Sequence, residues 1–148
     1  MLNQWTLGAD EEISFLTVEL VLAIHCEALK LHPENLAGVK NFGAIDAAVS
    51  RARNYHAYEG QCDLVALAAV IWHGVTCAHG FNDANKRTAL MSAFVFLEMN
   101  GLEVCAPPDE PGHLVNSLFR TSQTGENEFT VQALDTYLRS RCRWIGAN

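Results

Sequence analysis

The chain has 148 residues, 49% of them hydrophobic, and a formal net charge of −7 at pH 7. A chain of this length forms a single domain, residues 1–148, that buries about two-thirds of its unfolded surface. The acidic balance argues against a nucleic-acid interface, which needs clustered Lys and Arg, but it leaves room for a local basic site that binds one nucleotide.

The first part of the chain predicts one clear helix. Residues 1–12 are mixed and end in acidic side chains, so we expect this end to fray. Thr17 is a good N-cap for a helix that runs to Leu31, where His32-Pro33 stops it. His25 lies on or near the apolar face of this helix, and we interpret it as a hydrogen-bonded core residue rather than a ligand.

A second, short helix is expected over residues 46–53. It ends in Arg51 and Arg53, which could reach a bound phosphate, although cations are favoured in any last helical turn. Residues 54–62 are aromatic and polar, and we expect them to be too irregular for a helix.

Two apolar helices follow, joined by a short polar loop. Asp63 would cap the first, over residues 64–78, and Asn100-Gly101 would stop the second. Asp83 or Asn85 would cap the second helix and leave free backbone N–H groups and the positive dipole end facing the loop. The sequence therefore places an anion-binding helix end beside this loop.

The first turn of that second helix breaks a local rule. Lys86 and Arg87 stand there, although cations are disfavoured at a helix N-terminus. A violation of this kind favours a functional site that binds phosphate. Any helix–loop–helix also needs a polar connection, so the pattern alone leaves the structural interpretation open.

The last third of the chain predicts a short strand and two helices. We expect an extended piece over residues 101–105, a helix over 113–121, a loop over 122–128, and a final helix capped by Thr130. No linker or repeat divides the chain. The expected fold is an all-α compact helical bundle with room for one small β-hairpin.

The five cysteines form no Cys-x-x-Cys pair, and most lie in apolar runs. We therefore expect buried free thiols in a reducing compartment. A zinc site built from His73, Cys77 and His79 lacks a clear fourth ligand. No basic, apolar leader and no apolar run of about 18 residues are present, so we expect a soluble, cytoplasmic protein with no membrane contact.

The loop between the two apolar helices carries a motif. Residues 79–87 read His-Gly-Phe-Asn-Asp-Ala-Asn-Lys-Arg, which resembles the signature of the Fic/Doc superfamily and in particular of its Doc-type (death-on-curing) toxins. The general Fic pattern is His-Pro-Phe-x-Asp/Glu-Gly-Asn-Gly-Arg-x-x-Arg. Lys86 in place of the second Gly, and Leu90 in place of the last Arg, separate Doc-like members from those that transfer adenylyl groups. Looser similarity extends over residues 13–140.

The resemblance implies transfer of a phosphoryl group from ATP to a protein hydroxyl. His79 would be the general base, a role that histidine often fills near neutral pH. Asp83 would hold Mg²⁺ together with the phosphate oxygens of the nucleotide. Asn85, Lys86 and Arg87 would bind the phosphates of ATP and spread the developing charge.

The resemblance also implies direction, target and partner. Doc-type proteins hold ATP so that the γ-phosphate reaches a threonine of translation elongation factor Tu, which arrests translation. A partner antitoxin silences the toxin by laying a C-terminal segment in its groove. In this family the region between the early helices often carries a flap that lays the target beside the site, and residues 54–62 are our candidate for it.

Two alternatives stay open. Nucleotidyl (AMP) transfer in the Fic manner is disfavoured by Lys86 and Leu90. A non-catalytic module that binds a peptide would have no need of the intact His79, Asp83 and Asn85.

Overall fold

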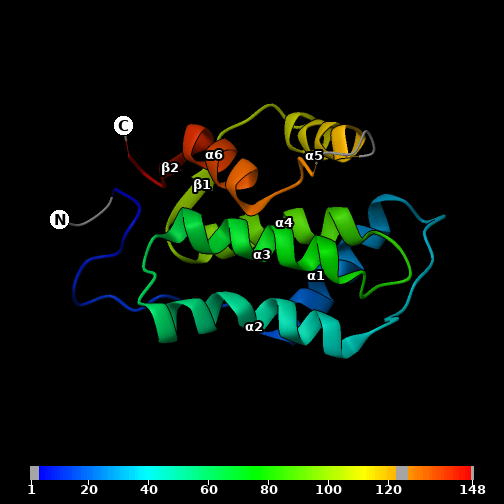
Figure 1. The fold of residues 1–148 in the computed structure, drawn as a ribbon, viewed down its shortest axis with the longest axis horizontal. Coiled ribbons are helices and arrows are strands. Elements are labelled where there is room, and N and C mark those ends of the chain that lie inside the picture. Colours follow the sequence, from blue (N-terminus) through cyan, green and yellow to red (C-terminus); the bar gives the residue numbers. More distant parts are fainter. Residues whose placement is uncertain (1–3, 123–126, 148) are drawn as a thin grey trace.

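Six helices and one two-stranded sheet build the described chain, residues 4–122 and 127–147, in the computed structural model (Figure 1). The elements are α1 (Val18–Leu31), α2 (Phe42–Glu59), α3 (Leu64–Ala78), α4 (Asn85–Met99), β1 (Leu102–Val104), α5 (Glu110–Ser122), α6 (Val131–Arg141) and β2 (Cys142–Trp144). The predicted all-α helical class is confirmed. None of the described helices is both long and apolar enough to span a bilayer.

Helix α3 lies at the centre of the bundle. Figure 1 shows it between α2 on one side and α5 and α6 on the other, and it packs against α2, α4 and α6. Eleven of its fifteen residues are buried, which is typical of a helix that is hydrophobic on every face. Trp72, fully buried, makes edge contacts with Phe94 and Tyr137. The loop that carries the motif leaves from the end of this rigid helix.

Three predicted N-caps are confirmed. Thr17, Asp63 and Thr130 each accept a hydrogen bond from the backbone N–H three residues later, at 2.9–3.1 Å. Asp63 does more than cap α3, because its buried carboxylate also lies 2.8 Å from the Arg139 guanidinium of α6. The first turn of α3 is thereby fixed to the last helix.

The helix predicted over residues 46–53 was too short at both ends, since α2 spans Phe42–Glu59. Asn41 caps α2 by accepting the N–H of Ala44 at 3.0 Å, and Gly60, in the left-handed conformation with φ 69°, ends it. The expected irregular stretch over 54–62 is therefore wrong up to Glu59. Two of its rings pack against other segments and favour the helix: Tyr55 lies against the core, and the ring of His56 lies 5.5 Å from that of Phe15.

The N-terminal segment does not fray where it is described. Trp5 is buried, its carbonyl accepts the N–H of Leu64 at 2.9 Å, and its ring lies 6.4 Å from that of Trp144. The expectation of a loose end is wrong at this residue, because a single large ring joins the chain end to the core. Residues 1–3 lie outside the described part.

The strand expected over 101–105 is confirmed as β1, but its partner was not foreseen. Strand β2 pairs with it antiparallel, with Glu103 opposite Arg143, and the two side chains form an ion pair at 2.7 Å. Residues 142–144 leave the helix to make this pairing, although their sequence continues a basic helical end. Most of the loop expected over 122–128 lies outside the described residues.

The expectation of buried thiols is wrong. All five cysteines are free, but only Cys142 is partly buried, and burial raises its pKa to about 12. Cys26 shows the reason, since it lies outside the buried stripe of α1 that includes Ile24 and His25. An apolar run in a helix covers the exposed face as well as the buried one.

We expect Asp63→Ala to lower the free energy of unfolding by about 1–3 kcal/mol, because it removes a helix cap and the bond to Arg139, which keeps Asp135 as its other partner. Urea unfolding followed by circular dichroism measures this. Glu27→Ala, which removes an exposed pair with Lys30, is the control and should have a much smaller effect. Equal effects of the two variants would contradict the role assigned to Asp63.

Candidate active site

The loop between α3 and α4 is shaped by two residues in the left-handed conformation. His79 ends α3 with φ 48°, and Ala84 precedes α4 with φ 62°. They are the non-glycine residues with positive φ in the described chain. Such backbone costs free energy, and its presence at a candidate site favours a functional reason. One of these residues stands at each end of the loop, at the end of α3 and before the start of α4.

Helix α4 begins without a side-chain cap. Its N-cap is Ala84, so the expectation that Asp83 or Asn85 caps the helix is wrong. The N–H of Thr88 is bonded to the carbonyl of Ala84, whereas the N–H groups of residues 85–87 have no partner in the described chain. These donors, the positive end of the helix dipole and two cations together make a strong site for an anion.

Asn85 braces the loop instead of capping the helix. Its side-chain oxygen accepts the N–H of Phe81 and its side-chain nitrogen donates to the carbonyl of Phe81, both at 3.0 Å. This needs an acceptor and a donor in one side chain, which Asn offers and an ionised Asp does not. The brace fixes the loop backbone around Phe81.

Phe81 anchors the loop in the core. Its side chain is only 1% exposed and stacks on the His25 ring, with 3.8 Å between ring centroids. His25 is buried, and its Nε2 lies 3.0 Å from the carbonyl oxygen of Asp83. The interpretation of His25 as a hydrogen-bonded core residue is confirmed.

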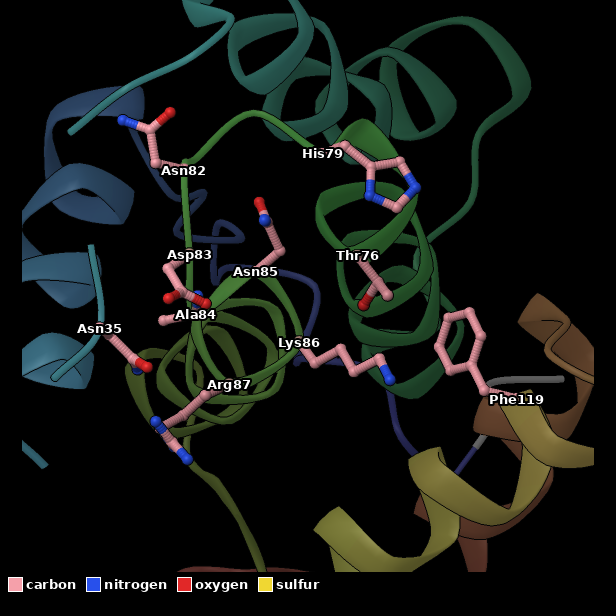
Figure 2. Close-up of a pocket in the computed structure, with 10 residues that line it drawn as sticks. All are labelled: Asn35, Thr76, His79, Asn82, Asp83, Ala84, Asn85, Lys86, Arg87 and Phe119. Atoms are coloured by element: carbon pink, nitrogen blue, oxygen red, sulfur yellow. The ribbon is translucent and has the colours of Figure 1, made fainter. Parts of the chain in front are cut away.

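A pocket of about 400 Å³ opens above this loop (Figure 2). The five site residues expected from the sequence all line this pocket. Their chemical roles stay predictions. The lining residues are Asn35, Thr76, His79, Asn82, Asp83, Ala84, Asn85, Lys86, Arg87 and Phe119.

The charged residues of the pocket differ in how they are held. The Asp83 carboxylate accepts the N–H of Ala84 at 3.0 Å and that of Leu36 at 3.2 Å, which orients it and leaves lone pairs for a cation. Figure 2 shows Lys86 and Arg87 diverging from the start of α4, with Lys86 directed toward Phe119. The exposed His79 side chain has no hydrogen-bond partner in the described chain.

An extended segment runs antiparallel to the site loop. Val39 forms a β-bridge with Phe81, the carbonyl of Gly80 accepts the N–H of Lys40 at 2.7 Å, and that of Gly38 accepts the N–H of Asn82 at 3.1 Å. This segment, residues 36–41, occupies the place beside the site that we expected of residues 54–62. The flap assignment to 54–62 is therefore wrong, since residues 54–59 form the last turns of helix α2.

Gly80 stands where the general Fic pattern has Pro, and the packing requires a small residue. A Cβ built at Gly80 would lie 2.1 Å from Cγ1 of Ile45, which is fully buried on α2. The loop therefore passes directly over α2. This glycine is explained by close approach rather than by backbone conformation.

The residues considered for zinc do not assemble into a metal centre. Cys77 Sγ lies 3.7 Å from His73 Nε2, but the described chain holds no group of three possible ligands. Burial lowers the pKa of His73. Neither Arg51 nor Arg53 lines the pocket, and Arg53 lies over the ring of Phe15.

Several pocket residues carried no sequence signal. Asn35 comes from the connection after α1, and Thr76 is a buried residue of α3. Phe119 comes from α5, where the sequence showed only an apolar helical stripe. Because these residues are brought to the loop by tertiary packing, their spacing along the chain could not reveal them.

Comparison with known proteins finds a matching family and similar proteins. Residues 15–97 match the Fic/DOC family, which is more than half of the chain. "Protein kinase doc" of Escherichia phage P1 is 37% identical over 89 residues, which cover 56% of this chain and 71% of that protein. "Toxin Doc" of Mycolicibacterium smegmatis is 33% identical over 72 residues, which cover 48% of this chain and 55% of that protein.

Gly80→Ala should lower the free energy of unfolding by about 1–3 kcal/mol, because the added methyl group overlaps Ile45. Chemical unfolding measures this. Gly112→Ala is the matched control, since a Cβ there meets nothing within 4 Å, and it should be neutral or stabilising.

The same clash predicts coupling between the two positions. In Gly80→Ala combined with Ile45→Ala, the loss of stability should be smaller than the sum of the single losses by about 1 kcal/mol or more. Strict additivity would contradict the close approach of loop and helix.

Proposed function

The chain belongs to the Fic/DOC family and is of the Doc type, and on that premise we propose that it is the toxin of a toxin–antitoxin pair, a cytoplasmic protein serine/threonine kinase that uses ATP and Mg²⁺. The proposed target is a threonine of elongation factor Tu, whose phosphorylation would arrest translation. One observation carries the proposal: the uncapped N-terminus of α4, with Lys86 and Arg87, lines the same pocket as His79.

The start of α4 would bind the phosphates of ATP. The N–H groups of residues 85–87 point into the loop region, and Lys86 and Arg87 add two positive charges. Asn85 would contribute its backbone N–H and its brace on Phe81, since both polar atoms of its side chain are already bonded. Donors fixed before the substrate arrives stabilise developing charge without reorganisation.

Asp83 fits the role of a magnesium ligand that acts together with the nucleotide. Its carboxylate is oriented by two backbone N–H groups and lines the phosphate pocket. Mg²⁺ prefers oxygen ligands and is often bound by one or two carboxylates plus substrate phosphates. The metal would neutralise charge on the phosphates during transfer.

His79 would act as the general base on the hydroxyl of the target. It lies at the rim of the pocket with an exposed side chain, where a protein substrate can reach it. Its ring nitrogen would take the hydroxyl proton as the oxygen attacks the γ-phosphorus, while the bond from that phosphorus to the bridging oxygen breaks and ADP leaves. Lys86 favours this direction, because its side chain stands where the adenylyl-transferring pattern has a glycine and an α-phosphate would approach the backbone.

Segment 36–41 would dock the target. It lies beside the site loop and leaves Leu36, Val39 and Phe42 exposed around it, at 66%, 44% and 51%. Exposed apolar side chains next to a catalytic pocket suit an extended protein segment. This surface would place a target hydroxyl near His79.

A neighbouring groove suits the antitoxin. It has a volume of about 500 Å³, runs between α4 and α5, and includes Leu31, Leu90 and Met91. Lys86 and Arg87 line both the groove and the pocket. An antitoxin segment seated there would cover the cations that bind phosphate.

The two alternative functions have less support. Nucleotidyl transfer in the Fic manner would need room at position 86 and a cation at position 90, where the chain has Lys and Leu. A binding module without catalysis would have no use for the exposed His79 opposite an uncapped helix end.

Labelled ATP separates these readings. With label on the γ-phosphate, the purified protein should transfer it to elongation factor Tu, and with label on the α-phosphate it should transfer none. His79→Ala should reduce transfer by about 10²–10⁴-fold while ATP still binds, because the base acts only on the hydroxyl. Transfer of the α-label would return the chain to the adenylyl-transferring class. Transfer of neither label would favour a binding module.

Magnesium should bind with nucleotide and hardly at all without it. Calorimetry should show weak or undetectable Mg²⁺ binding to the protein alone and clear binding of MgATP, and Asp83→Asn should weaken the second. Tight binding of Mg²⁺ alone would indicate a preformed metal centre and contradict the role given to Asp83.

A further inference from the structure

One wall of the pocket comes from outside the part of the chain that matches the family. Phe119 of α5 lines the pocket, whereas the family match ends at residue 97. The Nζ atom of Lys86 lies 4.4 Å from the centre of the Phe119 ring, within the range of a cation–π contact. The phosphate-binding cation is thus in contact with a residue that belongs to a different helix (Figure 2).

The Phe119 ring is itself held in place. Its ring stacks on Phe129, with centroids 4.5 Å apart, and Phe129 is 3% exposed. Phe129 stacks in turn on His73 of α3, at 5.2 Å and an interplanar angle of 15°. A column of three rings therefore connects the central helix to the Lys86 ammonium. A flexible lysine rests on a fixed surface.

Lys86 lacks the carboxylate partner that several cations of the described chain have, and like Arg53 it lies over an aromatic ring. Arg139, Arg141 and Arg143 each form an ion pair with a carboxylate, as Lys30 does. No carboxylate in the described chain pairs with Lys86, whose partner is an aromatic face. A ring attracts the ammonium without cancelling its charge, so the whole charge stays available to an anion.

We propose that Phe119 is a positioning residue of the phosphate site, which holds the Lys86 ammonium extended along the pocket wall before nucleotide arrives. The inference rests on the proposed function, since it needs Lys86 to bind phosphate. Binding then orders fewer rotatable bonds of the lysine than it would from a free side chain. Helix α5 thereby contributes to the affinity for nucleotide without touching the reacting atoms.

Nuclear magnetic resonance tests the contact in the unmodified protein. The ring current of Phe119 should shift the ε-methylene protons of Lys86 upfield relative to those of Lys40, an exposed lysine away from any described ring contact. If the ε-methylene protons of Lys86 had the same chemical shift as those of Lys40, the proposal would be overturned.

Calorimetry with MgATP tests the consequence. Phe119→Leu keeps much of the bulk but removes the π face, and should weaken MgATP binding about two- to fivefold, with kcat little changed. Phe119→Tyr keeps the face and should bind like wild type. A thermal melt of each variant reports any loss of folding separately.

A double-mutant cycle separates positioning from general support of α5. In a Lys86→Ala background, Phe119→Leu should cause no further loss of MgATP affinity, because the ring acts through the lysine. Equal losses in both backgrounds would assign Phe119 a structural role and overturn the proposal. Equal MgATP binding by wild type and Phe119→Leu would overturn it too, with the proposed function intact. If wild type binds no MgATP, the proposed function itself fails, and this inference with it.

Discussion

The burial of Phe81 is the constraint on which the site depends. The ring is closed in by His25, while Asn85 bonds both the N–H and the carbonyl of its backbone. With that residue fixed, the loop can hold two strained positions, and α4 can begin without a cap. The Asn85 side chain, which could have capped α4, braces the loop instead. The N–H groups at the start of α4 therefore stay unpaired, and they form the anion site.

Much of the fold follows from local chemistry in the sequence. Thr17, Asp63 and Thr130 are cap residues in front of apolar helical patterns, and each does cap its helix. The motif over 79–87 likewise named the charged residues of the pocket, because they come from one loop and one helical turn. Features set by neighbours in the chain were predictable.

Features set by distant packing were not. Helix α2 continues to Glu59 because Tyr55 and His56 pack against other segments, and β2 forms because β1 lies beside it. The uncapped start of α4 depends on Phe81 taking the side chain of Asn85. Phe119 reaches the pocket only through the placement of α5. None of these contacts leaves a periodic pattern or a spacing in the sequence.

A crystal structure with Mg²⁺ and a non-hydrolysable ATP analogue would decide whether the start of α4 binds the phosphates. We expect phosphate oxygens within hydrogen-bond distance of the N–H groups of residues 85–87, with Lys86 and Arg87 in contact and the γ-phosphate on the side of His79. An α-phosphate at that helix end would contradict the proposed direction of transfer. Phosphates bound elsewhere, with the start of α4 empty, would contradict the assignment of the site.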